Sequence, residues 1–295
     1  MLVLHPKTFA FPLPVARHSR SRMTTRELRE ICQKGSSEPF VISKYLYRPF
    51  TIYFSRLYIL CGASSNTVTF HSLVAGLVAA GFAISIQTWA LLAVAFFVQL
   101  YFILDHVDGE VARYNIHVGK QTPSLAGEFF DLWVHLHTYN IVFALMGLGM
   151  FRETGCVVWP ILGVIACNIS GSYQRLTLAS VLVGALARGR VALDDPRYAG
   201  LFGKSHGDTS DASPSAAKRF FRLGAELVLF PGNLVGISVA CLADFVLGTI
   251  GGAPWFFRAL YLAAYCAAGL ASKIFRTRQT IRELADAASP TLSDP

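Results

Sequence analysis

Charged residues are scarce in this sequence. Only 15% of the 295 residues are Asp, Glu, Lys or Arg, whereas about 25% is usual in a soluble domain. No charged residue occurs from Leu57 to Leu104, a run of 48 residues. Because about 20 apolar residues cross a bilayer core, this run can hold two membrane spans and a turn. The shortage of charge therefore favours an integral membrane protein over a buried soluble hairpin.

Cysteine motifs are also missing. The six cysteines are scattered, without a Cys-x-x-Cys pair or a spacing typical of zinc sites, so we expect free thiols. The short apolar run near the N-terminus is broken by Pro12 and Pro14, which argues against a secretory signal. Met23 precedes the first segment expected to be ordered and is an alternative start.

Six apolar segments have the length of membrane spans. Within ~2–4 residues, they lie near 66–86, 89–108, 127–150, 155–180, 227–248 and 254–274. The preceding segment, Val41–Leu60, mixes cations with aromatic residues, a pattern typical of a helix in the headgroup layer. We therefore predict an all-α integral membrane protein with about six transmembrane helices, preceded by an interfacial amphipathic helix.

The cations indicate how the chain is oriented. With six spans and an inner N-terminus, the outer loops hold only Arg152 and Arg258, and positive charge marks cytoplasmic loops. The net charge of +8 then reflects orientation and attraction to anionic membrane lipids, and no nucleic-acid motif accompanies it. We predict a cytoplasmic N-terminal arm at 1–38, a multi-pass membrane domain at 39–275 and a cytoplasmic tail at 276–295.

Acidic residues gather at the expected inner ends of the second and third spans. Asp105 and Asp108 are three residues apart, so they point about 60° from each other on a helix. On the third span, Glu128, Asp131 and His135 fall within an arc of about 100°. Ionisable groups at membrane depth cost ~2.5–3.5 kcal/mol each on insertion scales and are functional candidates. For Asp105 and Asp108, the alternative interpretation is a structural ion pair with Arg113 or Lys120.

The residue types at these helix ends suit a divalent cation and a phosphate. Clustered carboxylates repel one another, and oxygen ligands favour Mg²⁺, Mn²⁺ or Ca²⁺ over zinc. A divalent ion beside the lone Arg113 would neutralise phosphoryl oxygens. Gly109 and Ala112 would let a ligand approach the backbone, although close helix packing alone also explains small residues.

These residues form a recognisable motif. The matching positions are Asp105, Asp108, Gly109, Ala112 and Arg113, followed by Gly127, Asp131 and His135. The pattern resembles the signature of the class-I CDP-alcohol phosphatidyltransferase family, D-x-x-D-G-x-x-A-R and then G-x-x-x-D-x-x-x-D. Ser64–Thr69 also resembles the family's start of span one, with Ser65 in place of proline. The spacer of thirteen residues is longer than usual, and His135 replaces the fourth aspartate.

The resemblance implies a reaction in phospholipid biosynthesis. Members of the family transfer a phosphoryl-linked alcohol, such as phosphatidyl, from a CDP-alcohol to an acceptor hydroxyl and release CMP. One or two Mg²⁺ or Mn²⁺ ions would be bound by Asp105, Asp108 and Asp131. The CDP moiety would be bound by Asp108, Gly109, Ala112 and Arg113. The resemblance also implies a homodimer, and CDP-diacylglycerol or another CDP-alcohol as donor.

The histidine in the motif requires a separate interpretation. His135 could act as general base, because an imidazole with a pKa near 6.5 suits proton abstraction at neutral pH. It is a poorer Mg²⁺ ligand than a carboxylate, and Glu128 on the same face would complete the metal site. The simpler explanations are a polar packing role for His135 and a helix-start position for Glu128.

Two other functions remain open. A protein with this fold and an altered fourth position could bind CDP-lipid without turnover. A solute or ion carrier could use Asp105, Asp108 and Arg113 along its pathway. The charges cluster at one end of the predicted spans and not at the midplane, which argues against a carrier.

Overall fold

The computed structural model describes residues 23–34, 38, 40–122, 124–170 and 232–288, and every regular element within them is a helix. This agrees with the predicted all-α class. Most of the predicted N-terminal arm, the second half of the span predicted at 155–180 and the first residues of the span predicted at 227–248 lie outside the described residues.

Four helices are long and apolar enough to cross a membrane. They are α3 (Ser65–Ala83), α4 (Ala90–His117), α5 (Leu125–Thr154) and α10 (Gly232–Thr249). They correspond to the first, second, third and fifth predicted spans. The other two predicted spans correspond to α6 (Val158–Ser170) and α11 (Phe256–Ala288), which are not among the four.

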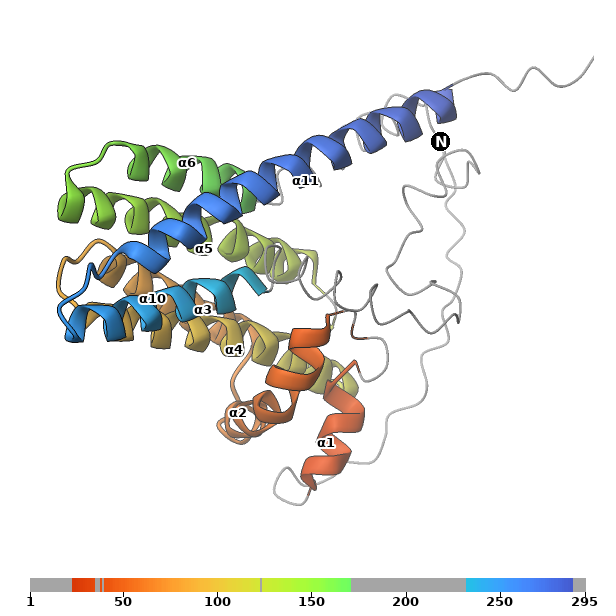
Figure 1. Cartoon of the computed structure of the whole chain (residues 1–295). Helices are drawn as coiled ribbons and strands as arrows, with labels where there is room; N and C mark the ends of the chain where they lie inside the picture. Colours follow the sequence, from red (N-terminus) through yellow and green to blue (C-terminus); the bar gives the residue numbers. More distant parts are fainter. Residues whose placement is uncertain (1–22, 35–37, 39, 123, 171–231, 289–295) are drawn as a thin grey trace, which may run out of the picture.

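The main contacts between these six helices form a closed ring. Around it, α3 packs on α4, α4 on α10, α10 on α11, α11 on α6, α6 on α5, and α5 on α3. The short loops α3–α4, α5–α6 and α10–α11 lie together at one end, and α11 continues past the other helices at the opposite end (Figure 1). Gly147 and Gly163 face backbone atoms across the α5–α6 contact, so the absence of side chains lets these two helices approach closely.

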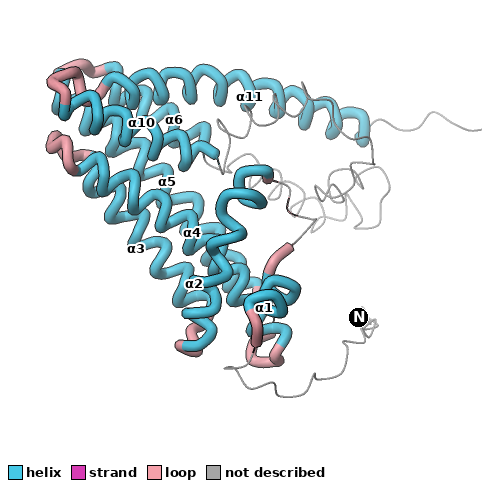
Figure 2. The backbone as a smooth tube through the Cα atoms, turned by 60° about the horizontal axis from the view of Figure 1, so that its bottom comes forward, coloured by secondary structure: helices cyan, strands magenta, loops and turns pink. Residues whose placement is uncertain are grey.

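Three further elements lie toward the end away from those loops (Figure 2). They are α1 (Thr25–Cys32), the π-helical turn η2 (Ser43–Tyr47) and α2 (Arg48–Leu60). One face of α2 is buried and α2 packs on α4, whereas several large apolar side chains on its other face are exposed. The exposed set is Phe50, Tyr53, Phe54, Leu57 and Leu60. An apolar row of this kind is the surface that a helix in the headgroup layer needs.

Helix α1 packs against the bundle. A capping box between Thr24 and Glu27 fixes its first turn, which satisfies backbone N–H groups that would otherwise lack partners. Leu28 and Cys32 are buried, and the helix contacts both α2 and α4. The described part of the predicted N-terminal arm therefore joins the core of the membrane domain.

The loop end of the bundle holds a buried ion network. Arg258, 2% exposed, donates from Nε to Asp244 over 2.8 Å and from Nη2 to Glu153 over 2.9 Å. Asp244 also accepts from the backbone N–H groups at the start of α11. The network links α5, α10 and α11, and full pairing removes most of the cost of burying these charges.

Candidate metal centre

Asp105 on α4 and Asp131 and His135 on α5 converge near one point. Their ligand atoms all lie within 4.8 Å of one another. His135 Nε2 is 2.6 Å from Asp105 Oδ1 and 3.3 Å from Asp131 Oδ1. The predicted approach of acids from the second and third spans is therefore confirmed for Asp105 and Asp131. We call these three residues the metal triad, because they could bind a metal ion.

The imidazole of the triad is held from both sides. His135 Nδ1 lies 2.9 Å from the hydroxyl of Tyr101, and Tyr101 is buried. The opposite nitrogen, Nε2, faces the two aspartates. A second hydrogen bond of this kind fixes the orientation of a metal-binding imidazole. Tyr101 was not singled out by the sequence, in which it is one aromatic residue in an apolar span.

Asp108 lies beside the triad but is not part of it. Its side chain is buried, and its Oδ2 accepts a hydrogen bond of 2.8 Å from Thr69 Oγ1 on α3. The charges of Asp105 and Asp131 act on this carboxylate. Thr69 lies in the segment Ser64–Thr69, which resembles the family's start of span one. This segment therefore contains a residue in contact with Asp108 of the motif.

Arg113 lies over the small residues of the motif. A Cβ built on Gly109 would meet Arg113 Nη1 at 3.4 Å and Nη2 at 3.7 Å. The Nε of Arg113 donates to the backbone carbonyl of Cys32 at the end of α1. Ala112 is half-buried one residue before. The guanidinium thus faces the backbone beside Asp108, where a phosphate could approach.

Two motif-related residues of α5 lie apart from the triad. A Cβ on Gly127 would be 3.4 Å from Asn66 Oδ1, an ordinary contact distance, so Gly127 lies against α3 but its lack of a side chain is not required there. Glu128 is exposed and is not among the residues whose ligand atoms converge. Its role as a further metal ligand stays a prediction.

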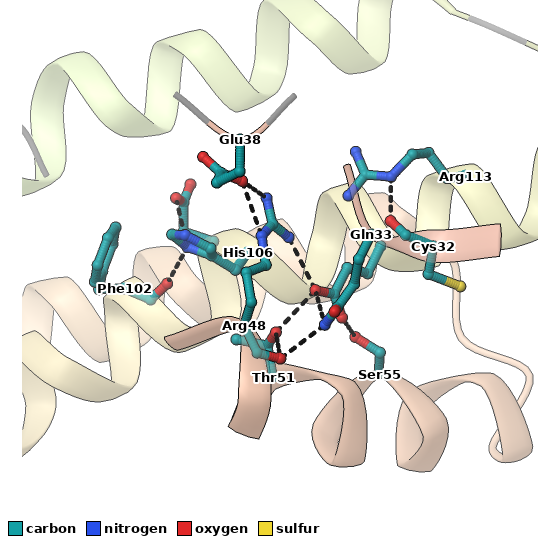
Figure 3. Close-up of polar contacts among 11 residues, drawn as sticks. Cys32, Gln33, Glu38, Arg48, Thr51, Ser55, Phe102, His106 and Arg113 are labelled. Carbon is teal, nitrogen blue, oxygen red and sulfur yellow. Dashed lines mark hydrogen bonds and ion pairs between the residues drawn. The ribbon is translucent and has the colours of Figure 1, made fainter. Parts of the chain in front are cut away.

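The sequence motifs did not reveal the buried carboxylate of Glu110. Its side chain is fully buried and accepts four hydrogen bonds from α2 and the end of α1 (Figure 3). The donors are Gln33 at 3.1 Å, Arg48 at 2.9 Å, Thr51 at 2.8 Å and Ser55 at 2.6 Å. The sequence signal for Glu110 was an acidic residue within an apolar span. It was passed over because Glu110 stands at a position where the motif accepts any residue.

Arg48 connects this carboxylate to a second one. It binds Glu110 through Nη1, and its Nε and Nη2 donate to Glu38 Oε2 over 2.9 and 2.6 Å. The contact between Arg48 and Glu38 is visible in Figure 3. Burial, together with the nearby charge of Glu110, raises the pKa of the Cys32 thiol to about 12. The junction of α1, α2 and α4 is therefore enclosed and electrostatically paired.

A cavity among the described residues lies away from the triad. It is an apolar groove of about 430 Å³ between α10 and α11, lined by residues that include Val239, Ala243 and Leu260. None of its lining residues belongs to the metal triad or to the motif. We therefore place the candidate chemistry at the triad, where the ionisable groups are.

No family model and no curated protein matches this chain.

Proposed function

We propose that the chain is a metal-dependent transferase of phospholipid biosynthesis. It would move a phosphoryl-linked alcohol, such as phosphatidyl, from a CDP-alcohol to an acceptor hydroxyl and release CMP. The convergence of Asp105, Asp131 and His135 from two helices is the observation that carries the proposal. Asp108 and Arg113 lie on the same helix as Asp105, within the motif, and the charge of Asp108 acts on the Arg113 guanidinium.

The donor atoms of the triad fit a divalent cation. Two carboxylates and one imidazole suit Mn²⁺ better than Mg²⁺, which prefers oxygen ligands. A bound ion would neutralise charge on the diphosphate of the donor and on the departing CMP. Asp108, buried beside the two acids of the triad, is the residue available for a second ion.

Arg113 would bind the diphosphate. Its Nε is occupied by the carbonyl of Cys32, and its two terminal nitrogens lie over Gly109. Two parallel N–H groups match the oxygen atoms of a phosphate, which makes a guanidinium a specific phosphate ligand. The absent side chain of Gly109 lets the Arg113 guanidinium lie close to the helix backbone, where it would meet the diphosphate.

The transfer needs a base. The acceptor oxygen forms a bond to the β-phosphorus, the bond from that phosphorus to the oxygen of CMP breaks, and the hydroxyl proton passes to the base. His135 Nε2 is the predicted proton acceptor, but the same nitrogen faces the two aspartates. Proton abstraction and metal binding compete for this atom, and the metal affinity of His135 variants separates the two roles.

The direct test is exchange of labelled CMP into CDP-diacylglycerol by the purified protein in detergent, with acceptor alcohols present, because a direct transfer incorporates the label only when the reaction runs in reverse. We expect exchange that requires Mn²⁺ or Mg²⁺, stops on chelation and is abolished by Asp105→Asn and by Asp131→Asn. Glu30→Gln on the exposed face of α1 is the matched control, and it should behave as wild type. Full exchange in both asparagine variants would overturn the proposal.

One observation favours the alternative of a CDP-lipid-binding protein without turnover. His135, where the family has an aspartate, lies in ion-pairing distance of both Asp105 and Asp131. An imidazolium would partly neutralise the acids and so weaken their demand for a metal ion. This alternative predicts that the protein binds CDP-diacylglycerol but does not exchange CMP, with or without added metal.

The placement of the site in the cell is part of the same proposal. The cation distribution supports a triad at the cytoplasmic face of a multi-pass membrane protein, and the family resemblance implies a homodimer. The exposed aromatic and aliphatic row on α2 would hold that helix in the headgroup layer, next to the lipid substrate.

A further inference from the structure

The end of α1 is attached to α4 at two points. The carbonyl oxygen of Cys32, the last residue of α1, accepts from Arg113 Nε. The next residue, Gln33, donates from Nε2 to Glu110 Oε1 over 3.1 Å. Glu110 and Arg113 are three residues apart and so lie on one face of α4. Two consecutive residues of the N-terminal segment therefore bind successive turns of the helix that carries the motif.

Several contacts make this attachment firm. Leu28 and Cys32 are buried at the contact, and Gln33 Nε2 also donates to the carbonyl of Arg48 over 2.7 Å, which joins α1 to α2. The last carbonyls of a helix lack partners within the helix and carry partial negative charge, so a guanidinium is a favourable partner for them. Figure 3 shows Cys32, Gln33 and Arg113 together at this junction.

The attachment determines how Arg113 faces the site. A guanidinium is planar, so fixing its Nε to a carbonyl restricts the plane in which the two terminal nitrogens lie. In the structure these nitrogens lie over Gly109, and the charge of Asp108 acts on the guanidinium. Without α1, the side chain would keep its rotational freedom and would have to lose it on binding phosphate.

We propose that the C-terminal end of α1, residues 32 and 33, is a positioning element of the substrate site. It holds Arg113 so that the two terminal nitrogens of the guanidinium are presented to a diphosphate at Gly109. The inference rests on the proposed function for the identity of the ligand. Gln33 acts through Glu110 and the position of α1, and it makes no contact with the substrate itself.

A double-mutant cycle tests the coupling. Gln33→Ala removes the side-chain contact, and we expect the KM for CDP-diacylglycerol to rise roughly tenfold, as for a lost hydrogen bond to a charged group, with kcat much less affected. In an Arg113→Ala background, Gln33→Ala should change KM no further. Equal effects of Gln33→Ala in both backgrounds would overturn the proposal.

A matched variant on the same helix controls for general damage to α1. Arg26 and Glu30 form an ion pair on the exposed side of the helix, with side chains 90% and 68% exposed. Exposed pairs of this kind contribute little to stability, so Arg26→Ala should leave KM unchanged. A rise in KM equal to that of Gln33→Ala would mean that any change in α1 has this effect, and it would refute the specific role.

A second measurement does not depend on activity. The docked Cys32 thiol is buried, and its pKa of about 12 makes it unreactive toward N-ethylmaleimide. In Arg113→Ala, modification of Cys32, followed by mass spectrometry of its peptide, should become roughly tenfold faster because α1 leaves α4 more often. Cys241, buried in α10, must stay unmodified to show that the bundle is intact.

The two measurements separate the two proposals. An unchanged rate of Cys32 modification in Arg113→Ala, with Cys241 protected, would show that Arg113 does not hold α1 and would overturn the inference. A wild-type protein that neither binds nor exchanges CDP-diacylglycerol would overturn the proposed function. Accelerated modification in that case would still establish the docking of α1 on Arg113.

Discussion

Removal of the Glu110 carboxylate tests how the N-terminal helices are held on the bundle. The side chain is fully buried and accepts hydrogen bonds from four side chains. Glu110→Ala leaves these donors without their acceptor and breaks the buried pair with Arg48. Breaking a buried ion pair from one side costs about 3–5 kcal/mol. We expect the free energy of unfolding to fall by this amount.

Glu110→Gln separates the charge from the shape of the side chain. Glutamine keeps one oxygen that can accept hydrogen bonds, but it removes one of the two negative charges that pair with Arg48 and leaves only that of Glu38. The expected loss is about 1.5–3 kcal/mol, the range for hydrogen bonds to charged groups. Denaturant unfolding of the purified protein in detergent, followed by tryptophan fluorescence, measures both variants.

The control for this series is Glu30→Ala, which changes an exposed carboxylate on α1 and should leave the free energy of unfolding unchanged. A loss below about 0.5 kcal/mol in Glu110→Ala, the size seen for ordinary surface substitutions, would refute the reasoning. It would show that the hydrogen bonds to Glu110 do not contribute to the stability of the fold.

Three further outcomes are expected. Asp131→Asn and His135→Ala should each weaken Mn²⁺ binding at least about tenfold, measured by electron paramagnetic resonance of the free ion. Unchanged affinity in His135→Ala with lost turnover would assign the histidine as base only. In intact cells, a membrane-impermeant maleimide should modify the exposed Cys156. The exposed Cys61 should react only after the cells are permeabilised. The reverse pattern would contradict the proposed orientation. Arg258→Met should lower the free energy of unfolding by about 3–5 kcal/mol, because the buried Asp244 and the neighbouring Glu153 both lose their cation. Unchanged stability would contradict a structural role.

The transmembrane helices were the part of the fold most accessible from sequence. The run without charge from Leu57 to Leu104 predicts α3 and the first part of α4, because hydropathy alone decides whether a segment suits a bilayer. The length of α11 was harder to predict. It continues through the predicted tail to Ala288, where the sequence is polar and hydropathy carries no signal.

The candidate site was predictable where it depends on spacing within one helix. Asp105 and Asp131 could be placed on inward faces from periodicity and motif, and they do converge. The contact between Arg113 and Cys32 could not be predicted, because its acceptor is a backbone carbonyl that every residue type offers. The same holds for Tyr101 beside His135, since only tertiary packing brings the two together.

The length of α11 has a consequence for the aqueous side of the protein. At 1.5 Å per residue, its 33 residues extend about 50 Å, against roughly 30 Å for a hydrocarbon core. Its last turns therefore stand well clear of the other helices, as Figure 1 shows. This protruding rod carries the exposed Arg276, Arg278 and Arg282, and it keeps them at a fixed height beyond the end of the bundle that lies opposite the short loops.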